Sequence, residues 1–162
     1  MQKSTWANLL LGGLVVGTFD ITYAITFWKL MRDVAPIRIL QSVAAGLLGR
    51  EAARAGGVQT ALLGTFLHYF IATTIVIVYW IACRYLPLLA RHPILCGAVY
   101  GIGVYLVMNY VVVPLSAARS TTKPMAIWVV CSVIVHMFLI GVPAAWFASR
   151  AVTTVSAGNS AA

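Results

Sequence analysis

The sequence predicts an all-α integral membrane protein, with four transmembrane helices and a short amphipathic helix between the first two spans. Composition is the first indication: of 162 residues, 62% are hydrophobic and 9% are charged, whereas a soluble domain carries roughly 25% charged residues. The second is that the charges fall in clusters separated by long apolar runs. The third is the lack of the alternating segments typical of a transmembrane β-barrel. Together they argue against a soluble enzyme, a disordered chain and a nucleic-acid-binding protein.

Runs without charge define the expected spans. Three of them lie between basic residues, namely Arg54 to Arg84, Arg91 to Arg119 and Lys123 to Arg150. A fourth run, near the N-terminus, contains one acid, Asp20. Each exceeds the ~20 apolar residues that cross a bilayer as a helix, and lipid offers backbone groups no alternative hydrogen bonds. We therefore expect transmembrane helices over about residues 6–31, 60–84, 94–115 and 124–148.

The spans are expected to form a single domain over residues 1–150. The remaining residues, 151–162, are mostly small and polar, so we expect a disordered tail. The net charge of +8 does not indicate nucleic acid, because the bases lie beside span ends, where they meet lipid phosphates. We therefore expect membrane lipids as partners, no nucleic acid, and either a homo-oligomer or association with another membrane protein.

The longest connection, about residues 32–59, contains a segment that is amphipathic at helical spacing. Pro36 suits the first turn of a helix. The apolar residues recur every three or four positions, as Leu40, Val43, Ala44, Leu47 and Leu48. We predict an interfacial helix over about 36–55, with its apolar face on the membrane and with Arg38 and Gln41 toward water. A re-entrant segment, favoured by the glycines within it, is the alternative.

Each span also has one face of small residues, which allow membrane helices to approach closely. The clearest examples are two pairs of glycines spaced four residues apart, Gly13 with Gly17 and Gly97 with Gly101. We predict that these four glycines lie at helix-packing contacts.

The strongest polar residue of each span shares its small face. These residues are Asp20, His68, Asn109 and His136, and polar groups in a span point into the bundle. We therefore predict an intramembrane polar layer. A rise of about 1.5 Å per residue places Asp20 level with His136, and His68 level with Asn109, so we expect those two contact pairs.

Such a layer has several functional interpretations. An ionisable group inside the bilayer is costly, which makes it a candidate for handling protons or a small solute. A narrow four-span pathway would then favour a homo-oligomer. The alternative is an accessory or scaffold subunit, in which the polar contacts only fix helix register. A third is a haem protein with both intramembrane histidines as ligands. The sequence has no nucleophile–base set, phosphate-binding loop or zinc spacing among its three cysteines, so we expect no enzyme, metal or cofactor.

Spans two to four carry a recognisable pattern over about residues 65–150. Its residues are His68, Tyr79, Pro87, Gly97, Gly101, Pro114 and His136. In these positions the chain resembles the YagU-like family of bacterial inner-membrane proteins, whose biochemical activity is not established. Asn109 stands where that family has a histidine, and Asp20 has no counterpart in it.

The resemblance implies a bacterial plasma membrane, a four-span plan and both termini in the cytoplasm. The distribution of bases implies the reverse orientation, because the side opposite the termini carries more of them. We follow the resemblance and expect cytoplasmic termini.

Overall fold

A computed structural model describes residues 3–118 and 124–159 of the chain. This part of the chain is helical and contains no strand. Its helices include four that are long and apolar enough to cross a membrane, Ser4–Arg32, Gly57–Tyr85, Pro93–Leu115 and Ala126–Val152. The predicted fold class is therefore confirmed, and the ends of the spans lie within a few residues of those expected.

The first two spans are the continuous helices α1 (Lys3–Arg32) and α4 (Gly57–Tyr85). Each of the other two contains a π-helical segment. The third span consists of α6 (Pro93–Val107), η1 (Met108–Val112) and α7 (Val113–Leu115). The fourth consists of α8 (Ala126–Val135), η2 (His136–Gly141) and α9 (Val142–Asn159).

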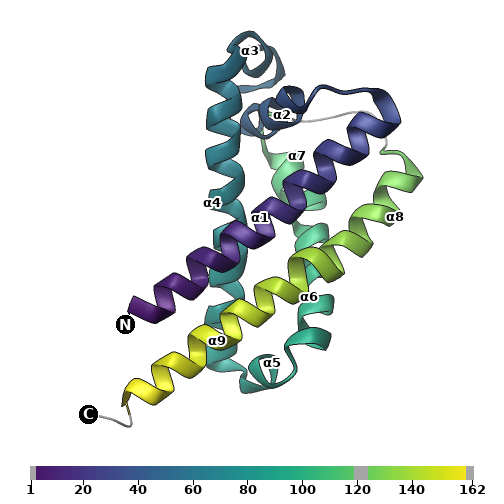
Figure 1. The fold of residues 1–162 in the computed structure, drawn as a ribbon. Helices are drawn as coiled ribbons and strands as arrows, with labels where there is room; N and C mark the ends of the chain where they lie inside the picture. The colour runs from purple at the N-terminus through teal and green to yellow at the C-terminus, as the bar shows by residue number, and fades with distance from the viewer. Residues whose placement is uncertain (1–2, 119–123, 160–162) are drawn as a thin grey trace.

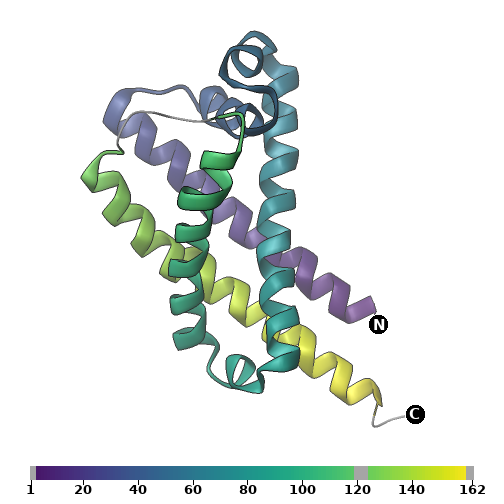
Figure 2. The same ribbon diagram turned by 180° about the vertical axis from the view of Figure 1, so that it is seen from behind.

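The connections lie at opposite ends of the bundle. The short helix α5 (Pro87–Arg91) lies toward the end where α1 begins and α9 finishes (Figure 1). The helices α2 (Pro36–Leu48) and α3 (Arg50–Ala55) lie at the other end, which we call the α2 end (Figure 2). The α1 helix and the fourth span cross α4 obliquely in both views. This tilt decides which polar side chains meet.

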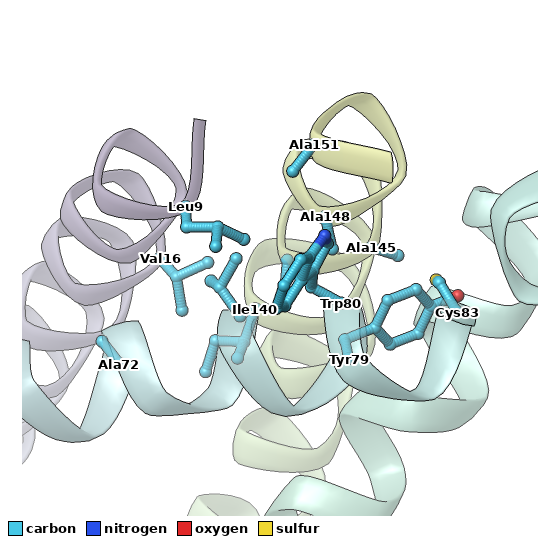
Figure 3. Packing of buried hydrophobic residues seen from close by; sticks show 12 residues of the cluster. Leu9, Val16, Ala72, Tyr79, Trp80, Cys83, Ile140, Ala145, Ala148 and Ala151 are labelled. Atoms are coloured by element: carbon cyan, nitrogen blue, oxygen red, sulfur yellow. The ribbon is translucent and has the colours of Figure 1, made fainter. Parts of the chain in front are cut away.

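The apolar core is formed by α1, α4 and the fourth span (Figure 3). Leu9 and Val16 of α1 pack with Val76 of α4 and Ile140 of η2, and all four are at most 2% exposed. Four alanines of α9 face this cluster, namely Ala144, Ala145, Ala148 and Ala151. Their small side chains allow α9 to approach α1 and α4 closely.

The end of α9 differs from the prediction. We expected residues 151–162 to be disordered, but the helix continues to Asn159. The side chain of Ala151 is fully buried in the core cluster, and alanine favours the helix, so the start of this segment belongs to the packed bundle. The last residues, 160–162, lie outside the described part of the chain.

The glycines predicted at packing contacts lie where two helices nearly touch. A Cβ added to Gly13 would meet Thr73 of α4, and one added to Gly17 would meet Tyr69. In α6, a Cβ on Gly97 would meet the fourth span, and one on Gly101 would collide with the backbone carbonyl of His136. The α1–α4 and α6–η2 contacts thus both depend on the absence of a side chain.

The interfacial segment forms two helices instead of the single helix predicted over 36–55. Gly49 separates α2 from α3 with a φ of +83°, a conformation that glycine adopts without strain. The α2 helix packs along the first half of α4. At this contact, a Cβ on Gly64 would collide with the backbone carbonyl of Leu40.

Gln41 also differs from the prediction, because it does not face water. Its side chain is 3% exposed. The amide nitrogen donates to the Gly57 carbonyl oxygen at 2.8 Å, and the amide oxygen accepts from Arg38 at 2.9 Å. Burial costs little when both groups are paired. The outer apolar residues Leu47 and Leu48 are exposed, as expected of a membrane-facing surface.

The α6–η2 contact gives a first testable prediction, with a matched control one half-turn away. We expect Gly101→Ala to lower the free energy of unfolding by about 1–3 kcal/mol, because the backbones must separate. Gly103→Ala on the same helix should be neutral or slightly stabilising, because a Cβ there meets nothing within 4 Å. Thermal unfolding of both variants in detergent measures the difference. Equal melting temperatures would contradict the close approach.

Candidate functional site

A cavity of about 330 Å³ lies within the bundle and extends toward the α2 end. Its walls come from α1, α2, α4, the third span and the fourth span. All four residues of the predicted polar layer line it, namely Asp20, His68, Asn109 and His136. The structure therefore brings together side chains that are far apart in sequence. Their role in function remains a prediction.

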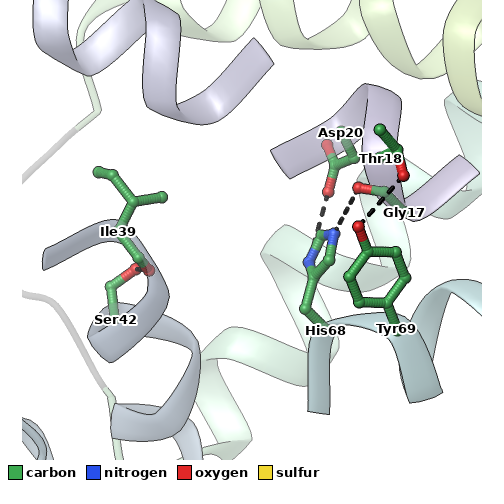
Figure 4. Close-up of polar contacts among 7 residues, drawn as sticks. All are labelled: Gly17, Thr18, Asp20, Ile39, Ser42, His68 and Tyr69. Carbon is green, nitrogen blue, oxygen red and sulfur yellow. Dashed lines mark hydrogen bonds and ion pairs between the residues drawn. The ribbon is translucent and has the colours of Figure 1, made fainter. Parts of the chain in front are cut away.

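The His68 side chain connects α4 to α1. Its Nε2 lies 2.8 Å from the Gly17 carbonyl oxygen, and its Nδ1 lies 4.0 Å from Oδ2 of Asp20 (Figure 4). The His68 side chain is 11% exposed and that of Asp20 is 33% exposed. A carbonyl oxygen can only accept a hydrogen bond, so His68 Nε2 must carry the hydrogen.

This fixed hydrogen determines which atom of His68 faces Asp20. A neutral imidazole with its hydrogen on Nε2 presents a lone pair at Nδ1, and here that atom faces the Asp20 carboxyl. The two atoms are 4.0 Å apart, which is beyond hydrogen-bond distance. The arrangement therefore places a proton acceptor beside a carboxyl group without a direct hydrogen bond between them.

The observed partner of Asp20 differs from the predicted one. We expected Asp20 to pair with His136, and His68 to pair with Asn109. Asp20 makes its ion-pair contact with His68, whose other nitrogen is bonded to Gly17. His136 lines the same cavity and interacts with the Asp20 carboxyl only at longer range. The depth estimate treated the helices as upright, whereas α1 crosses α4 obliquely (Figure 1). The tilt brings Asp20 to the level of His68.

His136 is held by its own helix. Its Nδ1 lies 2.8 Å from the carbonyl oxygen of Ser132, so Nδ1 carries the hydrogen and Nε2 is left as an acceptor. The ring packs edge-on against Tyr105, with centroids 5.3 Å apart. The hydroxyls of Tyr23 and Ser132 are 3.0 Å apart and form a polar contact between α1 and the fourth span.

Asn109 lies at the edge of the cavity with an exposed side chain. Its amide nitrogen donates to the Tyr105 carbonyl oxygen at 2.9 Å within the same helix. It does not contact His68 as we had expected. It remains a wall residue that can offer its amide oxygen to a ligand.

Two features of the site were missed in the sequence. Asn109 lies in η1, and His136 is the first residue of η2. Single π-helical turns are frequent at functional sites because they change which side chains face inward. Pro114 and Pro143 follow these segments by two residues, and proline removes a backbone donor from the helix. The positions of these two prolines were the sequence feature from which the π-helical segments could have been inferred.

The histidines are poorly arranged for haem. Bis-histidine ligation needs a free ring nitrogen from each residue, directed at one iron. In His68, Nε2 is bonded to the Gly17 carbonyl oxygen, and Nδ1 faces the Asp20 carboxyl. Within residues 3–118 and 124–159, no group of three or more His, Cys, Asp or Glu side chains could hold a metal ion.

The observed pairing can be tested against the predicted one. We expect Asp20→Asn and His68→Gln to be non-additive, with a coupling between about 0.6 kcal/mol, the average for polar pairs in a membrane, and about 1.7 kcal/mol, the largest such value. His68→Gln is chosen because an amide nitrogen can still donate to Gly17. The matched cycle combines Asp20→Asn with His136→Gln and should show a smaller coupling. Thermal unfolding in detergent measures both cycles, and a larger coupling to His136 would contradict the geometry.

Comparisons with known proteins identify no relative of this chain. No protein-family model matches the chain, and searches of curated proteins and of solved structures find no significant match. The function must therefore be inferred from the site itself.

Proposed function

We propose that this multi-pass membrane protein is not an enzyme and that it binds and moves protons, alone or with a small solute, through the bundle cavity. The observation that carries the proposal is the pair formed by His68 and Asp20 at the cavity wall. The Gly17 carbonyl fixes the tautomer of His68. The nitrogen that is left to gain a proton is therefore Nδ1, which faces Asp20. Histidine is suited to this role because it titrates near neutral pH.

The cavity itself supports a small ligand. Its volume of about 330 Å³ is at the lower end of ligand pockets, which span roughly 300–1,000 Å³. The wall combines apolar residues with the acceptors of His136 and Asn109 and the hydroxyl of Tyr23. Such a wall suits a molecule of a few heavy atoms, or a short chain of water molecules.

The alternative function is that of an accessory or scaffold subunit. One observation favours it: α4 and α6 leave a groove of about 490 Å³ between them, lined mainly by apolar side chains. Gly103 lines this groove, and a Cβ added to it would meet nothing within 4 Å. In that case the polar layer would only fix helix register, and the groove would receive a partner helix.

We further propose the setting that the sequence resemblance implies. The protein would be a member of the YagU-like family, in a bacterial plasma membrane, with both termini in the cytoplasm. The cavity would then extend toward the opposite, periplasmic face. Four spans enclose a narrow pathway, so we propose that it acts as a homo-oligomer.

Proton flux in liposomes tests the main proposal. We expect the purified protein to accelerate decay of an imposed pH gradient, read by an internal pH dye, above the rate in empty liposomes. Asp20→Asn should return the rate to that of empty liposomes, because an amide cannot exchange a proton with His68.

Asp33→Asn provides the matched control for the same chemical change. Asp33 is an exposed acid just beyond α1, paired with Lys29 and outside the cavity, so its loss should leave the flux unchanged. The wild type and both variants must first show the same elution profile and helical content. A folded wild type without flux would contradict proton transport and favour the accessory-subunit alternative.

A further inference from the structure

A second pocket, of about 550 Å³, lies at the α2 end. It is formed by the end of α1, by α2 and α3, and by the segment after α7. Three arginines line it, Arg38 from α2 and Arg50 and Arg54 from α3, together with Gln41 and Ser42. None of the described residues that line it is acidic.

The pocket lies at the level expected for the membrane surface. Its lining comes from the end of α1 and from α2 and α3, and these elements lie at the end of the bundle where α1 ends and α4 begins (Figure 1). Trp28, which lines it, belongs to the class of residues that concentrate at the lipid headgroup level. A ligand in this pocket would therefore lie at the depth of lipid phosphates.

Two of the arginines are held in place by the fold. Arg50 donates from Nε and from one terminal nitrogen to the Ala118 carbonyl oxygen, at 3.3 and 3.1 Å. Arg38 donates to the buried Gln41, which is itself anchored to Gly57. These contacts use neutral acceptors, so they orient the guanidinium groups without neutralising them.

Among the described residues, no acid forms an ion pair with these three arginines. The chain contains three acidic residues in all. Asp20 lines the inner cavity, Asp33 is paired with Lys29, which lowers the pKa of Asp33, and Glu51 is exposed on α3 outside the pocket lining. Three like charges around one pocket repel one another unless an anion comes from outside.

We propose that the arginine pocket binds an anionic phosphate group, either the headgroup of an anionic lipid or a free phosphate ion. Guanidinium groups match phosphate oxygens in geometry and charge. Basic pockets beside membrane spans are typical lipid-headgroup sites. Ser42 and the amide of Gln41 provide neutral polar groups in the same wall. This site is separate from proton handling and does not depend on the proposed function.

Ligand-induced stabilisation of the purified full-length protein in neutral detergent tests the proposal. One arm adds phosphatidylglycerol, with phosphatidylcholine of the same chains as reference. The other adds inorganic phosphate, with chloride at equal ionic strength as reference. We expect the wild type to be stabilised by an anionic phosphate. Stabilisation by phosphatidylglycerol alone identifies a lipid headgroup, whereas stabilisation by inorganic phosphate without lipid identifies a free ion.

The variants locate the site. Arg54→Gln and, separately, Arg38→Gln should each weaken the apparent affinity about five-fold, since one base near a membrane surface contributes on the order of 1 kcal/mol. The matched control is Arg91→Gln, an exposed arginine on α5 toward the opposite end of the bundle, which should bind as the wild type does. Equal stabilisation by both lipids with no phosphate effect would overturn the proposal, as would an equal loss in the Arg91 variant. Elution profiles establish that each variant is folded.

Discussion

The hydrogen bond between His68 and the carbonyl oxygen of Gly17 is the contact on which the arrangement of the polar groups depends. It joins α4 to α1 at 2.8 Å, at the point where a side chain on residue 17 would strike Tyr69. The glycine therefore allows the approach, and its carbonyl sets the tautomer of the histidine. The remaining ring nitrogen then faces Asp20. Helix packing and the tautomer of His68 are thus two consequences of one contact.

Much of the fold could be predicted because its signals are local. A long apolar run with few or no charges is read directly from the sequence, and all four runs, including the first with its single Asp20, form helices long and apolar enough to cross a membrane. The faces that carry Asp20, His68 and His136 also follow from helical periodicity, and these residues line one cavity. In a membrane, polar side chains must point inward, so the choice of candidates required no knowledge of helix arrangement.

The contacts between elements could not be predicted in the same way. The partner of Asp20 depends on the tilt of α1 against α4, which no local pattern encodes. Gln41 is polar and was expected to face water, but its burial depends on Gly57 and Arg38, which satisfy both ends of its amide. The arginine pocket is likewise invisible in the sequence, because α2, α3 and Ala118 meet only in the folded chain. Pro114 and Pro143 were the exceptions, since each could have indicated the adjacent π-helical segment.

The central proposal is that His68 carries its hydrogen on Nε2 and directs Nδ1 at Asp20 for proton exchange. Nitrogen NMR of histidine-labelled protein in lipid, with His68 assigned by loss of its signals in His68→Gln, tests this directly. The account predicts a protonated Nε2 and an Nδ1 signal that responds to Asp20→Asn. An unprotonated Nε2, or an Nδ1 signal unaffected by Asp20→Asn, would contradict it.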